Sequence, residues 1–205
     1  MKYPEFIDNV ETITMRDPLS DLLGTFEDGI VEFRYVDIVK AAGHSCPTVA
    51  GAYLMTLTAL KELYGQEIPV RGMIKVELPK PRDEGVSGVI ANIITHITGA
   101  TEDMGFKGLR GKFSRINLMD FSVKMQCSAR FTRMDTSACV EALYDPSCIQ
   151  PHQEMAHLMP KSVSGSATEE ERKLFGEYWQ ERVSRIFAEY REKEIVKISR
   201  VEKMD

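Results

Sequence analysis

Three stretches of the chain carry hydrophobic residues at a helical spacing of three or four positions. The first covers residues 47–64, with a proline at its first position and a glycine directly after its end. The second covers residues 87–98 and also ends at a glycine. The third follows Thr168, which forms a capping-box pattern with Glu171. The sequence therefore predicts three helices, of which the last is long and amphipathic.

Other stretches alternate hydrophobic and polar residues with the period of two that is typical of half-buried strands. We expect single strands over residues 29–35, 70–78 and 195–201. Residues 116–131 show the same period over a greater length and predict one long strand or a bent pair.

Shorter helices are expected between these elements. One covers residues 18–23 with Asp17 as its N-terminal cap, and another covers residues 36–42. Residues 135–167 contain three prolines and predict short helical pieces joined by turns.

The order of the elements limits the possible fold classes. Strands and helices do not follow a strict alternation, and neither G-x-G-x-x-G nor G-x-x-x-x-G-K occurs, which disfavours nucleotide-binding folds. We expect an α+β fold, in which a mixed or antiparallel sheet packs against helices and a long amphipathic helix lies near the C-terminus. We divide the chain into a core of residues 1–150 and a C-terminal extension of residues 151–205.

Composition and charge exclude several classes of protein. The 205 residues are 43% hydrophobic and 28% charged, as in ordinary soluble globular proteins. A net charge of −5 argues against nucleic acid as the main partner. No apolar signal segment opens the chain, and the uncharged run of residues 46–60 is too short to span a membrane. We therefore expect a cytoplasmic protein without a membrane span.

The candidate chemistry lies in the Gly43-His44-Ser45-Cys46-Pro47 segment, directly before the first long helix. An imidazole and a thiol two positions apart suit zinc, and also iron or copper. At a helix N-terminus, the free N–H groups and the dipole favour a thiolate at Cys46, which also suits a catalytic cysteine. A third interpretation is a buried turn in which His44 bonds the backbone and Cys46 fills space.

Other histidines and acids are weaker candidates. His96 lies on the second helix and is either a metal ligand or a core residue. Asp120 either orients a ligand histidine or caps a turn. His152 and His157 miss the i, i+4 spacing of helical zinc ligands.

The remaining cysteines do not form a zinc ribbon, because the chain has no C-x-x-C pair. Cys127 lies in the alternating run of residues 116–131 and is expected to be a buried strand residue.

Three motifs resemble the E-subunit family of formylmethanofuran dehydrogenase. Residues 42–47, with Gly51 four residues further on, resemble the family's H-G-H-x-C-P-G-x-x-x-G signature. Residues 98–101 look like its T-G-C-T segment, and residues 118–121 fall where it has a Leu-x-x-Asp-Tyr pattern. The resemblance covers about residues 20–131.

The resemblance implies an α+β core, commonly a homodimer, that binds a transition metal through the histidine and cysteine of the signature. His44 and Cys46 match those positions. Ala42 replaces the leading histidine, Thr48 replaces the glycine after the proline, and Val89 lies near the place of the family's cysteine before the second helix. The zinc ribbon of some members is absent. His96 then becomes the candidate substitute ligand.

Together these observations predict a cytoplasmic, homodimeric metal-binding protein in an oxidoreductase or one-carbon context. Its ligands would be His44, Cys46 and His96, and the ion would be zinc or, as a second choice, iron. Partner subunits are compatible with the resemblance. Two alternatives remain open. One is a thiol-based enzyme with Cys46 as its catalytic nucleophile or redox group, and the other is a non-catalytic assembly subunit that works through residues 101–115 or the last helix.

Overall fold

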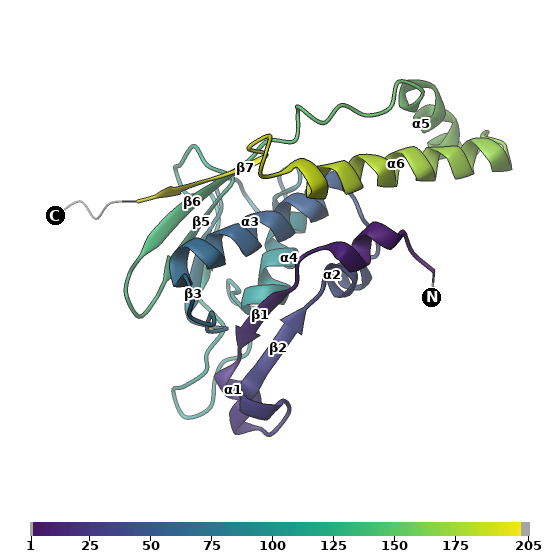
Figure 1. Ribbon diagram of the computed structural model, residues 1–205. Coiled ribbons are helices and arrows are strands. Elements are labelled where there is room, and N and C mark those ends of the chain that lie inside the picture. Colours follow the sequence, from purple (N-terminus) through teal and green to yellow (C-terminus); the bar gives the residue numbers. More distant parts are fainter. Residues whose placement is uncertain (1, 202–205) are drawn as a thin grey trace.

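A buried helix, α3 (Pro47–Tyr64), lies at the centre of the computed structural model, which describes residues 2–201 (Figure 1). It packs on one face of a sheet and also contacts the helices α2, α4 and α6. Most of its residues are buried, including Tyr53 and Leu54. Helix-favouring alanine, leucine and methionine residues make up much of α3, and Gly65 ends it.

The main sheet has five strands in the order β4-β3-β5-β6-β7. The pair β3–β4 is parallel and the other three pairs are antiparallel, so the sheet is mixed as expected. In chain order the strands are β3 (Ile74–Glu77), β4 (Met119–Asp120), β5 (Ala129–Arg133), β6 (Cys139–Tyr144) and β7 (Val196–Arg200).

The N-terminal part of the chain forms a separate antiparallel pair of strands, β1 (Ile13–Arg16) and β2 (Ile30–Phe33). A 3₁₀ helix, η1 (Glu5–Asn9), precedes the pair. The helices α1 (Pro18–Leu22) and η2 (Glu27–Gly29) join the two strands.

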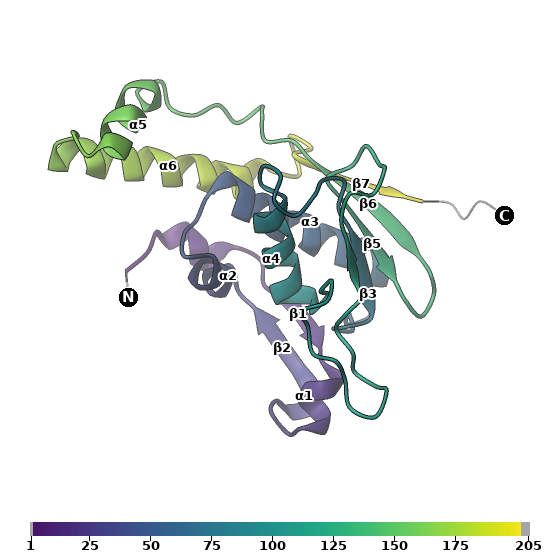
Figure 2. The same cartoon turned by 180° about the vertical axis from the view of Figure 1, so that it is seen from behind.

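The remaining helices are α2 (Tyr35–Ala42), α4 (Ser87–Thr98), α5 (Met155–Ser164) and α6 (Glu169–Glu189). Figures 1 and 2 show α5 and the first half of α6 side by side, extending away from the sheet as an arm. The chain after α6 returns to the core, because β7 pairs with β6 at the edge of the main sheet. No helix within residues 2–201 is long and apolar enough to cross a membrane.

The fold class is confirmed, and so are the helices expected from hydrophobic spacing. The expected bounds 47–64 and 87–98 are those of α3 and α4. The caps are confirmed as well: the Asp17 carboxylate accepts hydrogen bonds at the start of α1, and the Thr168 capping box opens α6.

One long strand over residues 116–131 is wrong, and the alternative of two strands is met only by short ones. Only β4 and β5 form there, and residues 121–128 between them are irregular. Ser122 has a φ of 60°, a left-handed conformation that cannot continue a strand. Cys127 is buried as expected, but it lies in a bend rather than in a strand.

Candidate functional site

The segment that carries His44 and Cys46 forms a tight connection between two helices, here called the α2–α3 corner (residues 43–46). Helix α2 ends at Ala42, and Gly43 follows with a φ of 78°, in the left-handed region where glycine is favoured. Pro47 then opens α3 in the first helical position, with Cys46 as its N-cap.

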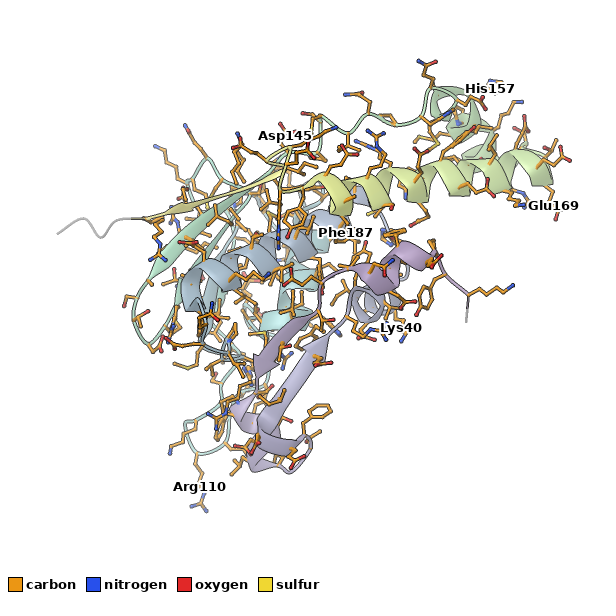
Figure 3. All side chains as sticks on the ribbon, viewed as in Figure 1. Lys40, Arg110, Asp145, His157, Glu169 and Phe187 are labelled. Atoms are coloured by element: carbon orange, nitrogen blue, oxygen red, sulfur yellow. The ribbon has the colours of Figure 1, made fainter. Side chains whose placement is uncertain are left out.

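Helix α6 holds the middle residue of this corner. The backbone carbonyl of Ser45 accepts hydrogen bonds from Trp179 Nε1 at 3.0 Å and from Gln180 Nε2 at 3.1 Å. The Ser45 hydroxyl lies 3.0 Å from the buried Tyr35 hydroxyl. Phe187, labelled in Figure 3, packs its ring on Tyr35 with 4.5 Å between centroids. The corner is therefore held by Tyr35 on the adjoining helix α2 and by two α6 side chains that are far away in the sequence.

Tyr144 on β6 fixes the start of α3. Its hydroxyl donates a 2.6 Å hydrogen bond to the Pro47 carbonyl. Its ring lies against Gly51, where an added Cβ would come within 2.3 Å of the ring. A glycine at position 51 is therefore required by close packing between α3 and β6.

His44 is exposed, and its ring has one nitrogen engaged. Nδ1 lies 3.1 Å from the Ala42 carbonyl. Because a carbonyl only accepts hydrogen bonds, Nδ1 carries a proton, so in the neutral ring the Nε2 lone pair is free. Metal-binding histidines in proteins show the same arrangement, in which a backbone bond fixes the tautomer and the ring orientation.

His96 lies on the other side of a shared pocket. Both histidines line a pocket of about 390 Å³ between the end of α2 and one face of α4. The other lining residues are Ala41, Ala42, Val89, Asn92, Ile93 and Thr95. The His96 ring packs edge-on against Phe33 at 5.9 Å between centroids. Partial burial lowers the pKa of His96, and the charge of Arg71 lowers it further, which favours the neutral imidazole.

Arg71 fixes the end of α4 on which His96 lies. Its guanidinium donates hydrogen bonds to the carbonyls of Ile97 at 2.9 Å and His96 at 3.2 Å. A third bond of 2.9 Å joins Arg71 to the buried Asp17 carboxylate, which also binds Arg115 at 2.6 Å. The position of His96 therefore depends on partly buried Arg71 and, through it, on the buried Asp17 and Arg115.

The Cys46 side chain does not line the pocket of the two histidines. Its side chain is 8% exposed, and Sγ accepts a hydrogen bond from the Val49 N–H at 3.5 Å. The residues that line the histidine pocket do not include Cys46. The structure thus brings His44 and His96 together and places the Cys46 sulfur against the N-terminus of α3.

The other candidate residues lie elsewhere. The Asp120 carboxylate pairs with Lys75 at 2.9 Å on the sheet. His152 stacks on Tyr178, and His157 lies on the α5 arm near the start of α6 (Figure 3). Within residues 2–201, no group of three or more histidine, cysteine or acidic side chains has the arrangement of a complete metal site.

Sequence reasoning missed the residues that support the corner. Tyr35 on α2 and Trp179 and Gln180 on α6 contact it, and Tyr144 on β6 contacts the adjacent start of α3. No local pattern marks these contacts, because they depend on how distant segments pack.

Comparison of the chain with protein-family models and with curated proteins gives no match. What the corner can bind therefore follows from its own side chains. Two imidazoles that line one pocket, with a thiol at the adjacent helix start, are donors that suit zinc or iron(II).

Proposed function

We propose that this chain binds a transition-metal ion at the α2–α3 corner, with His44 and His96 as ligands and Cys46 as the third donor. One observation carries the proposal: His44 and His96 come from different elements and line the same pocket. The bond from His44 Nδ1 to the Ala42 carbonyl supports it, because it leaves Nε2 free for a metal.

We include Cys46 among the proposed ligands because it lies two positions after His44. Its sulfur lies at the N-terminus of α3, where it accepts a hydrogen bond from the Val49 N–H. Zinc is the proposed ion and iron the second choice, since both accept imidazole and thiolate ligands. When bound, such an ion supplies Lewis acidity, and iron would add redox chemistry.

We further propose that the chain is a divergent relative of the E-subunit family of formylmethanofuran dehydrogenase and acts as a homodimer in the cytoplasm. The match of residues 42–47 and Gly51 to the family signature supports this, and these residues form the corner and the first turns of α3. The proposed role is metal binding in an oxidoreductase or one-carbon context, alone or with partner subunits.

A thiol-based enzyme is the second candidate function. It rests on the position of Cys46 as N-cap of α3, a position at which catalytic cysteines occur in proteins. The 8% exposure of the side chain counts against it, because a nucleophile must reach its substrate.

Elemental analysis of purified protein tests the metal proposal. Wild type should retain zinc or iron after dialysis, and His44→Ala and His96→Ala should each lose most of it. His157→Ala is the matched control, because this exposed histidine lies on α5 outside the pocket. Equal metal content in all four proteins would contradict the proposal. Cys46→Ala with full metal content would remove the cysteine from the ligand set.

A further inference from the structure

A second pocket lies between the α5–α6 arm and the start of α3. Its volume is about 310 Å³, within the range of small-molecule sites. It shares no lining residue with the histidine pocket. The residues that line it are Pro47, Pro151, Met155, Ala156, Met159, Pro160, Tyr178, Trp179 and Arg182.

The walls of this pocket are suited to an aromatic ring. Met155 and Met159 come from α5, and thioethers pack well against aromatic groups. Tyr178 and Trp179 come from α6, and both are held in place. The Tyr178 ring stacks on His152 at 3.6 Å between centroids, and the Trp179 indole is fixed by its bond to the Ser45 carbonyl.

Arg182 supplies a positive charge at the pocket. Its Nε donates a 2.8 Å hydrogen bond to the Ile149 carbonyl, which orients the guanidinium. Salt bridges within residues 2–201 involve neighbouring arginines such as Arg185, but Arg182 takes part in none of them. A guanidinium without a carboxylate partner, beside an apolar pocket, is a good receptor for a planar carboxylate.

From these observations we infer that the pocket binds a small aromatic carboxylate, with its ring between the methionines and Trp179 and its carboxylate on Arg182. This site is independent of the proposed metal. None of its lining residues is a proposed ligand.

Binding of 3-phenylpropionate, followed by fluorescence, tests this inference on the full-length protein. Trp179 is the chain's single tryptophan, so its emission reports directly on the pocket. The neutral analogue 3-phenylpropionamide should bind about tenfold more weakly, because it loses the charged hydrogen bonds to Arg182. Equal affinity for acid and amide, or no saturable signal with the acid, would overturn the inference.

A pair of substitutions on α5 locates the site. Ala156→Phe should fill the pocket and abolish binding of the acid without harming the fold, because Ala156 is exposed. Val163→Phe is the matched control on the same helix, since Val163 is 82% exposed and does not line the pocket. Unchanged binding in Ala156→Phe, or equal loss in both variants, would overturn the assignment.

Discussion

The indole N–H of Trp179 donates a 3.0 Å hydrogen bond to the backbone carbonyl of Ser45, a residue 134 positions earlier in the chain. Ser45 lies between the two signature residues His44 and Cys46, and Gln180 donates to the same carbonyl. The C-terminal extension therefore fixes the backbone of the candidate site. Without α6, this nearly buried carbonyl would lose both of these side-chain donors.

The two donors to Ser45 should be partly redundant. Trp179→Phe keeps an aromatic ring and removes the N–H, and we expect it to lower the free energy of unfolding by about 1 kcal/mol. The double variant with Trp179→Phe and Gln180→Leu should lose more free energy of unfolding than the two single variants together, because the carbonyl then has neither donor. Urea unfolding of the four proteins in this cycle measures the coupling, and strict additivity would contradict it.

Gly51 should not tolerate a side chain. In Gly51→Ala the new Cβ would meet the Tyr144 ring at 2.3 Å, so we expect a loss of about 1–3 kcal/mol in the free energy of unfolding. Gly176→Ala on α6 is the control, because no atom lies within 4 Å of its added Cβ. The free energy of unfolding of that variant should increase by up to about 1 kcal/mol, because alanine has a higher helix propensity than glycine. Thermal unfolding of both variants checks the opposite signs.

Asp17 should make stability depend on acid pH. Burial raises the pKa of its carboxyl, but the hydrogen bond from Arg71 and the charges of Arg115 and Arg71 outweigh burial and lower the pKa below its usual value. The lowered pKa stabilises the fold above pH about 4, and this contribution is lost as the pH falls through the native-state pKa.

Asp17→Asn should therefore lower the free energy of unfolding by about 3–5 kcal/mol at pH 7, since it leaves two guanidinium groups without their carboxylate. The difference from wild type should shrink below pH about 4. Denaturant unfolding across this pH range is the measurement, and a difference that does not change with pH would show that the carboxylate charge is not the cause.

The four cysteines should react with iodoacetamide in an order set by exposure and pKa. Cys148 is exposed and should react first. Burial, with the nearby charge of Glu141, raises the pKa of Cys127 to about 11, so it should react last. Cys46 is buried and should also react more slowly than Cys148. Peptide mass spectrometry gives the order, and fast labelling of Cys46 would favour the thiol-enzyme candidate.

Much of the fold follows from local patterns in the sequence. Helices α3 and α4 have clear apolar spacing and a glycine after the last turn, and their bounds were predicted. The strand expected through residues 121–128 does not form, since Ser122 has a φ of 60°, which interrupts the extended backbone. Strands β1 and β6 were missed, since pairing with β2 and β5 rather than local periodicity stabilises them.

The candidate site was predicted only in part. His44 and His96 were named from their residue types and positions, and the structure places both at one pocket. The support from Arg71 and Trp179 depends on tertiary contacts that no spacing encodes. Cys46 was expected at a helix start and lies there, but its sulfur points toward the Val49 N–H rather than lining the pocket.

X-ray absorption at the metal edge tests the central claim most directly, because it identifies the ion and its ligands together. We predict imidazole nitrogens at about 2.0–2.1 Å and one sulfur at about 2.3 Å around zinc in wild type. The His96→Ala protein, reloaded with zinc, should show a weaker imidazole signal. A shell of oxygen atoms alone, or a spectrum unchanged by His44→Ala and His96→Ala, would contradict metal binding at the α2–α3 corner.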